Sequence, residues 1–288
     1  MTAVGSGKHT YTVNKDWFAL PEGWQLGWIP AVACDSQDRV YVYSRSARPM
    51  IVFDRAGQFI ASWGEEVLED AHGIFIDAED QVWCIERDTH CVHKFTCDGE
   101  LLLTLGTPKQ QGAVGEPFRL PTDLTLDAGG FIYVCDGYDN ACIHKYDPDG
   151  QFIKTWGSPG SGSGEFDLPH CVRFDGRGRL MVADRANNRI QFFDTDGNYL
   201  EEWGGFNHPD TIFLDGETVY VAELDQRVSI VTLDGERLAA WGSGARIDEP
   251  GEFLGCPHGI WMDSRGDLYV GEVQTNSRLQ KFELQGEL

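Results

Sequence analysis

The sequence has little positive charge and no apolar run long enough to cross a membrane. Its 288 residues include 23 lysines and arginines against 46 aspartates and glutamates, a formal net charge of −23. Such an acidic surface repels nucleic acid and anionic membranes, so we expect neither as a partner. Residues 1–10 are polar and Gly-rich, without the apolar core of a signal peptide. These absences predict a soluble, cytoplasmic protein.

The sequence also lacks any Cys-x-x-Cys pair, which argues against a structural zinc knuckle. Most of its eight cysteines stand inside apolar runs, as in Val82–Ile85 and Tyr133–Cys135. In such runs cysteine behaves as a small buried hydrophobic residue. We therefore expect reduced thiols, which agrees with a cytoplasmic location.

Helical periodicity is absent as well, and a sixfold internal repeat takes its place. In the fourth repeat, short strand-like runs alternate with turns such as Asp196-Gly197, where glycine tolerates the positive φ of a hairpin. The expected strands of this repeat are Cys171–Asp175, Leu180–Asp184, Arg189–Phe193 and Tyr199–Glu202. Four such antiparallel strands make one propeller blade. The repeat length of about 40 to 50 residues is also typical of blades.

We therefore predict an all-β, six-bladed propeller of four-stranded antiparallel blades, formed by residues 1–288 as one domain with a flexible segment 1–8. The sixth repeat ends after Arg278–Phe282 and supplies no fourth strand. The stretch His9–Val13 precedes the first blade and is expected to take that place. Closure of the ring by the N-terminal strand would cover the open sheet edge.

Alternate repeats carry a histidine in one equivalent slot: His72, His170 and His258. In a ring of six blades, alternate slots would face one another across the central axis. Three converging imidazoles with a fourth position open are the ligand set of a catalytic zinc site. We predict that these histidines bind Zn²⁺ or another divalent transition metal.

A second slot, at the end of each second strand, holds an acidic residue in five repeats and Ser44 in the first. An arginine follows this slot in three repeats. We expect the acidic residues to cap the following turn. The arginines are Arg45, Arg87 and Arg185, expected near the same mouth of the tunnel as the histidines. Because a guanidinium binds a carboxylate through two hydrogen bonds, these residues suggest a substrate with a carboxylate.

Several motifs make the resemblance to a known family specific. They span residues 72–77, 121–124, 136–140, 169–170, 183–191 and 257–258. The repeats resemble the NHL class of propellers, and within it the lyase domain of peptidylglycine α-amidating enzymes. The likeness covers most of the chain and is densest between residues 117 and 193.

The resemblance implies an enzyme that splits an α-hydroxyglycine carbinolamide into an amide and glyoxylate. It implies that the three slot histidines are the zinc ligands and that Tyr138 is the catalytic base. It also implies that Arg45 and Arg185 are active-site arginines. A phenol is a weak base at neutral pH, so Tyr138 would need nearby positive charge. The zinc would act as a Lewis acid toward the substrate hydroxyl.

The chain departs from the family at the calcium site. The resemblance places two carbonyl ligands at Val32 and Ile74, but Gly259 stands where the family has its ligand aspartate. Loss of the anionic ligand argues against a structural Ca²⁺. The disulfide cysteines of the family are absent too, which fits a reducing compartment.

Three further departures concern the substrate pocket. Cys256 replaces a methionine near the zinc, where it would shape the pocket or bind the metal. Arg87 is an additional cation that would bind substrate. Asp210, in the fifth slot, would orient a histidine, act as a base or bind metal directly.

The sequence leaves two alternative functions open. One keeps the metal site but uses it for hydrolysis or hydration of another small substrate. The other is a non-catalytic NHL module that binds a partner, because fold alone does not decide function. A small molecule or peptide with a carboxylate is the expected substrate. The oligomeric state is not indicated.

Overall fold

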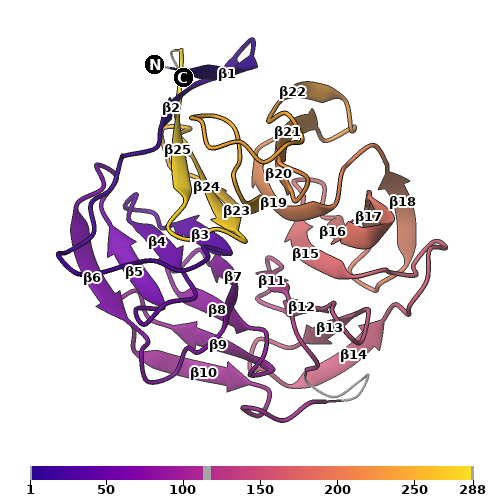
Figure 1. The fold of residues 1–288 in the computed structure, drawn as a ribbon. Coiled ribbons are helices and arrows are strands. Elements are labelled where there is room, and N and C mark those ends of the chain that lie inside the picture. Colours follow the sequence, from indigo (N-terminus) through magenta and orange to yellow (C-terminus); the bar gives the residue numbers. More distant parts are fainter. Residues whose placement is uncertain (1, 113–117, 287–288) are drawn as a thin grey trace. The chain divides into compact units, whose positions relative to one another are not determined.

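The computed structural model describes residues 2–112 and 118–286, which form six antiparallel sheets. The sheets are the blades of a six-bladed β-propeller, as the repeats predict, and Figure 1 shows the strands of each blade. The chain divides into two compact units. The first unit comprises residues 1–71 and 218–288, and the second unit comprises residues 72–217. The prediction of one domain over 1–288 stays a prediction.

The second unit contains the second, third and fourth blades, except that Ala71, the first residue of β7, belongs to the first unit. The second blade consists of β7 (Ala71–Ile76), β8 (Val82–Glu86), β9 (Cys91–Phe95) and β10 (Leu101–Leu105). The third consists of β11 (Asp123–Leu126), β12 (Ile132–Asp136), β13 (Cys142–Tyr146) and β14 (Phe152–Trp156). The fourth consists of β15 (Pro169–Phe174), β16 (Leu180–Asp184), β17 (Arg189–Phe193) and β18 (Tyr199–Trp203), with a 3₁₀ turn at Arg185–Asn187.

The other unit holds the first and sixth blades. The first consists of β3 (Ala31–Cys34), β4 (Val40–Tyr43), β5 (Met50–Phe53) and β6 (Phe59–Trp63). The sixth consists of β23 (Cys256–Met262), β24 (Leu268–Val273), β25 (Leu279–Leu284), β2 (His9–Asn14) and β1 (Ala3–Ser6). The fifth blade consists of β19 (Pro209–Asp215), β20 (Thr218–Glu223), β21 (Arg227–Thr232) and β22 (Arg237–Trp241).

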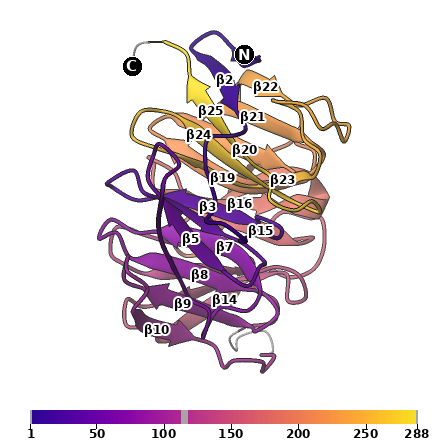
Figure 2. The same cartoon turned by 60° about the vertical axis from the view of Figure 1, so that its left-hand side comes forward.

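The N-terminal strand completes the sixth blade, as predicted. Residues of β2 pair antiparallel with β25, from Tyr11 opposite Leu284 to Asn14 opposite Lys281. Figure 2 shows β2 beside β25. Residues 3–6 form β1 and pair with β2; the predicted flexibility of segment 1–8 stays a prediction. The pairing satisfies backbone groups that β2 would otherwise present at an open edge.

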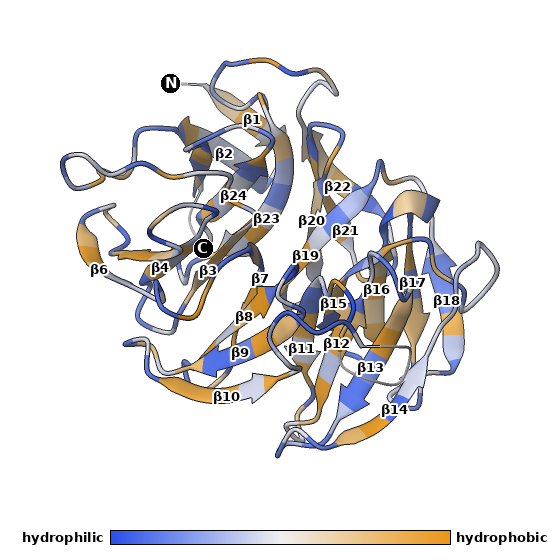
Figure 3. Ribbon diagram, turned by 60° about the horizontal axis from the view of Figure 1, so that its bottom comes forward, coloured by the Kyte–Doolittle hydropathy of each residue, from blue (hydrophilic) through white to orange (hydrophobic). Residues whose placement is uncertain are grey.

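Burial decreases from the inner to the outer strands of a blade. Every residue of β16 and β17 is buried, whereas β18 has three exposed residues. The apolar segments of β10 and β14 are visible in Figure 3. The outer strand also has a bulge at Leu200, because Tyr199 pairs with Phe193 while Glu201 pairs with Phe192. Bulges on edge strands discourage pairing with another chain.

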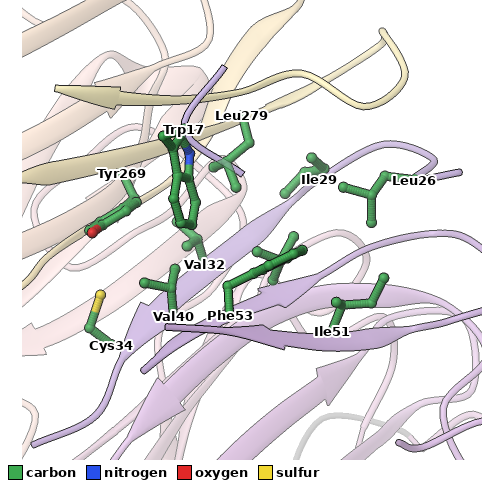
Figure 4. Packing of buried hydrophobic residues seen from close by; sticks show 11 residues of the cluster. Trp17, Leu26, Ile29, Val32, Cys34, Val40, Ile51, Phe53, Tyr269 and Leu279 are labelled. Carbon is green, nitrogen blue, oxygen red and sulfur yellow. The ribbon is translucent and has the colours of Figure 1, made fainter. Parts of the chain in front are cut away.

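Aromatic rings build the core of the first unit. Trp17 packs against Tyr269 and Phe53, with ring centroids 5.0 and 5.8 Å apart. Figure 4 shows Trp17 among residues of this cluster, including Val32 and Leu279. The segment before the first blade is thus held by apolar burial rather than by a strand.

The acidic residues of the second slot have a structural role, but the predicted capping is wrong for Asp184, which makes no side-chain capping hydrogen bond to the turn that follows it. Asp184 accepts hydrogen bonds from the Asp167 amide (2.8 Å) and from Nε of Arg189 (2.7 Å). Asp136 likewise accepts the Arg119 amide at 2.9 Å. Each carboxylate therefore ties the segment before the first strand of its blade to the end of the second strand. This fixes the link that carries the slot arginine.

Candidate metal centre

His72, on β7, has one defined tautomer. Its Nδ1 lies 2.8 Å from the carbonyl oxygen of Thr122. Because a carbonyl only accepts hydrogen bonds, Nδ1 carries the proton and Nε2 carries the lone pair. Such a bond on the remote ring nitrogen is the usual way in which a metal-binding histidine is oriented.

The other two slot histidines repeat this arrangement. In β15, Nδ1 of His170 lies 3.2 Å from the carbonyl oxygen of Asp210. In β23, Nδ1 of His258 lies 2.7 Å from the carbonyl oxygen of Pro30. All three acceptors lie at the start of the innermost strand of the next blade. All three side chains are at most 4% exposed. The repeat therefore presents three Nε2 lone pairs, which is the donor set that zinc prefers.

Glycines allow two of these contacts. A Cβ on Gly73 would lie 2.6 Å from the Thr122 oxygen, the atom that accepts from His72. A Cβ on Gly259 would lie 2.8 Å from the Pro30 oxygen, the atom that accepts from His258. Only glycine lets the neighbouring strand come this close, so the residue after the histidine sets the reach of the imidazole.

Tyr138 lies beside the histidines of the second unit. Its hydroxyl is 3.2 Å from Nε2 of His72, to which it donates. The ring centroids of His72 and His170 are 4.8 Å apart, and that of Tyr138 is 6.0 Å from His170. Tyr138 follows β12, where the glycine at 137 approaches the Pro169 carbonyl too closely for a side chain. A phenol is thus held within reach of both imidazoles.

Asp210 and Arg185 form a buried ion pair next to this group. NH1 of Arg185 lies 3.0 Å from Oδ2 of Asp210, and Oδ1 of Asp210 lies 3.2 Å from Nδ1 of His170. Both terminal nitrogens of Arg185 lie 3.4 Å from the Tyr138 hydroxyl. Burial raises the pKa of Asp210, and the Arg185 charge opposes that rise. Burial disfavours charge on Arg185, but Asp210 and Tyr138 raise its pKa above the ordinary value.

Arg87 lies on the same tyrosine from another blade. Its guanidinium carbon is 5.5 Å from the centroid of the Tyr138 ring, and that of Arg185 is 5.2 Å away. Arg87 binds Asp88 through Nε (2.8 Å) and NH2 (3.1 Å). The second unit therefore brings together His72, His170, Tyr138, Arg87, Arg185 and Asp210.

The remaining predicted residues, His258, Arg45 and Cys256, lie in the first unit. Arg45 pairs with Asp70 at 3.3 Å and donates to the Ala71 carbonyl at 2.9 Å. The sulfur of Cys256 lies 3.5 Å from Nε2 of Gln226 and 3.6 Å from NH2 of Arg246. Sequence reasoning missed Asp70 and Arg246, since both lie in loops outside the two slots.

The sequence pattern did not indicate a buried ion pair that lies next to the histidines. Arg173 binds Asp123, and Asp123 also accepts the Val172 amide at 3.2 Å. Burial raises the pKa of Asp123, against the opposing charge of Arg173. Asp123 directly follows Thr122, the partner of His72, so this pair links β11 to β15 beside both imidazoles. The aspartate in the motif at residues 121–124 is the sequence feature that could have indicated this pair.

A second group, Asp136, Cys142 and His144, also has the composition of a metal site. Nε2 of His144 lies 3.1 Å from Asp136 and its Nδ1 lies 2.7 Å from Thr155 Oγ1. In the next blade the same positions hold Asp184, Arg189 and Gln191, which form an ordinary hydrogen-bond network. We therefore interpret this group as the internal network of the third blade.

The calcium site of the resembling family does not fit this chain. A Cβ on Gly259 would lie 2.8 Å from the Ala31 Cα and 3.0 Å from the Val32 amide. An aspartate at this position would clash with the backbone of β3. The absence of an acidic ligand is therefore built into the packing of β23 on β3.

A cavity of about 500 Å³ opens next to Tyr138 in the second unit. Its walls include Asp139, Phe166 and Asn187. Asp139 pairs with Arg119 at 2.8 Å, and Asn187 binds Asp184 at 2.8 Å. The cavity has the size expected for a small ligand.

Comparisons with known proteins agree with the repeats. A model of the NHL repeat matches residues 118–146. The chain is 33% identical over 298 residues to NHL repeat-containing protein 3 of Homo sapiens, covering 96% of this chain and 84% of that protein. It is 28% identical over 240 residues to peptidyl-alpha-hydroxyglycine alpha-amidating lyase 1 of Drosophila melanogaster, covering 70% and 44%. The solved streptogramin B lyase shares the fold, with a TM-score of 0.63 at 14% identity over 96% of this chain and 98% of that one.

Proposed function

The chain belongs to the family of NHL repeat-containing proteins, and we propose that it is a zinc-dependent carbon–nitrogen lyase. Its substrate is an α-hydroxyglycine-type amide, which it splits into an amide and glyoxylate. The relatives of the chain include an amidating lyase, at 28% identity. The carrying observation is the shared tautomer of His72, His170 and His258, each set by a backbone carbonyl.

We propose that these three Nε2 atoms hold one Zn²⁺. When bound, the ion supplies Lewis acidity toward the substrate hydroxyl. Each imidazole is buried, and each has its Nδ1 held by a carbonyl of the next blade, so the orientation of each ring is already set. Such preorganisation favours metal binding over other roles for a buried histidine.

Tyr138 is the residue placed to move the proton. In the proposed reaction its phenolate takes the proton of the substrate hydroxyl, the C–N bond breaks, and the hydroxyl oxygen forms the new aldehyde. The electron pair of the broken bond stays on the amide nitrogen, which takes the proton back from Tyr138. Atoms and charge balance without water. Arg185, 3.4 Å from the phenol oxygen, stabilises the phenolate.

Metal analysis tests the site. Protein purified without added zinc should contain about one zinc per chain, as expected for a three-histidine site. His170→Ala should lower that content strongly, whereas His93→Gln, outside the proposed site, should leave it unchanged. A low metal content that does not respond to His170→Ala would contradict the metal site.

Glyoxylate release from α-hydroxyhippurate tests the reaction. Tyr138→Phe should lower kcat by about 100-fold or more, the usual range for loss of a general base, and leave the zinc content intact. Loss of both zinc and activity would show that Tyr138 is structural. Full zinc loading without glyoxylate release would favour the hydrolase or hydratase alternative.

We also propose a cytoplasmic location, because all eight cysteine side chains are thiols. A reducing compartment keeps buried thiols in this state.

A further inference from the structure

Two arginines lie on the ring of Tyr138, but the structure places them in different electrostatic situations. We infer that Arg87, and not Arg185, binds the substrate carboxylate, while Asp210 holds Arg185 on the tyrosine. This inference rests on the proposed function and assigns the recognition of the α-hydroxy acid carboxylate to one residue.

Arg185 is committed to a buried partner. Its side chain is 11% exposed and the Asp210 side chain is 0% exposed, with 3.0 Å between NH1 and Oδ2. If a substrate carboxylate took this guanidinium, Asp210 would be left as a buried carboxylate without its cation. Breaking a buried pair in this way is strongly unfavourable. The same guanidinium lies 3.4 Å from the Tyr138 hydroxyl through NH1 and NH2. Arg185 is therefore positioned to interact with the Tyr138 hydroxyl rather than with the substrate carboxylate.

Arg87, in contrast, binds a carboxylate that is mostly exposed to solvent. Its partner Asp88 is 57% exposed, while the Arg87 side chain is 24% exposed. An exposed ion pair contributes little free energy, so an incoming carboxylate can replace Asp88 at small cost. Asp88 would then return to solvent, where its charge is hydrated.

The present contact shows what Arg87 is oriented to bind. Nε and NH2 each donate to one oxygen of the Asp88 carboxylate, at 2.8 and 3.1 Å. This two-pronged geometry is the one by which arginine recognises carboxylates. The guanidinium carbon lies 5.5 Å from the ring centroid of Tyr138. A carboxylate that replaced Asp88 would therefore lie close to the proposed base.

Charge balance supports the same assignment. Asp210 cancels the charge of Arg185, and Asp123 cancels that of Arg173. Asp88, which binds Arg87, is by contrast mostly exposed and can turn toward solvent. Arg87 thus supplies the positive potential that attracts an anionic substrate to a protein of net charge −23.

Hippurate, a carboxylate without the reacting hydroxyl, is the probe for calorimetric titration. Arg87→Met should weaken hippurate binding by about 10- to 100-fold, the range for a lost charge-assisted hydrogen-bond pair. It should barely change binding of the neutral hippurate methyl ester. Asp88→Asn, the matched change in the same link, should tighten hippurate binding because it removes the competing carboxylate.

The assay separates this inference from the proposed reaction, since hippurate binding needs no turnover and glyoxylate release is measured independently. Arg87→Lys is the second variant in case Arg87→Met does not fold, and should show intermediate weakening. Unchanged hippurate binding in Arg87→Met would overturn the inference. So would an absence of hippurate binding in the wild type, or a loss of binding caused by Arg45→Met instead.

Discussion

At the scale of single residues, one interior position of the third strand is polar in five blades: it is a histidine or glutamine in four and Ser229 in the fifth. His93 and His144 hold it in the second and third blades, and Gln191 and Gln280 hold it in the fourth and sixth. Both histidines bond through Nδ1 to a threonine of the outer strand, at 2.9 and 2.7 Å. Glutamine fills this role without an ionisable group, so His93 adds a dependence on pH.

His93 should make stability fall in mild acid. Burial lowers its pKa to about 4, from a value of about 6.5 in the unfolded chain. Between these values the unfolded chain binds the proton and the folded chain does not. The stabilisation from neutral His93 is therefore complete above pH 6.5 and is lost as the pH falls toward 4, by up to about 3 kcal/mol.

His93→Gln, which installs the residue of the fourth blade, should flatten this dependence. The difference in unfolding free energy between wild type and variant, from urea titrations at several pH values, isolates the contribution of His93. It should change between pH 6.5 and 4 and stay constant between pH 7 and 8. A constant difference over the whole range would contradict the prediction.

At the scale of elements, the innermost strands pack backbone against backbone. Thr122 lies just before β11, yet its carbonyl oxygen is 2.8 Å from Nδ1 of His72 on β7. The same approach recurs between β23 and β3, where His258 reaches Pro30 at 2.7 Å. In both cases the residue after the histidine is glycine. The geometry of the histidines is therefore a property of strand spacing rather than of the imidazoles alone.

Gly259→Ala should disturb this spacing. The added Cβ would meet backbone atoms of β3 at 2.8–3.0 Å, and backbone cannot move aside cheaply. We expect a loss of about 1–3 kcal/mol in unfolding free energy and a reduced zinc content. Gly176→Ala is the control, since its Cβ would meet no atom within 4 Å. Gly259→Asp should destabilise the protein in the same way and should gain no stability from added Ca²⁺. A thermal midpoint equal to that of wild type for both Gly259 variants would refute the packing argument.

At the scale of the whole molecule, the first residues of the chain complete the last blade. β2 pairs with β25 although about 270 residues separate them. Tyr11 in β2 is 0% exposed and packs on Trp241, with ring centroids 5.6 Å apart. Closing a blade with both ends of the chain makes folding of that blade depend on the complete polypeptide.

Tyr11→Ala should therefore destabilise the protein by about 3 kcal/mol or more, the cost of removing a buried aromatic ring. Thr12→Ala, on the half-exposed face of the same strand, is the control and should have a small effect. Chemical denaturation followed by tryptophan fluorescence measures both. Equal effects of the two substitutions would show that the N-terminal strand is only loosely attached.

How much the sequence predicted depended on the distance over which an interaction acts. The Asp-Gly turns and alternating runs fixed the strands of the fourth blade within one or two residues, because hairpins are set by local φ values and side-chain alternation. The equivalent slots gave the three histidines the same local position, each beside a backbone carbonyl of the next blade, since a repeat turns sequence spacing into equivalent places in the blades. The strand at residues 3–6 had no local signal, because β1 depends on pairing with β2.

The sequence by itself determined the number of blades, the strand that completes the last one and the family. Only the tertiary structure decided which polar groups contact each other. Asp210 pairs with Arg185, Asp123 pairs with Arg173, and each of the three slot histidines binds a carbonyl of the next blade. These partners lie on different blades, up to 228 residues apart for His258 and Pro30. No local pattern encodes such contacts, because they arise only when neighbouring innermost strands pack closely enough for a side chain to cross from one to the next.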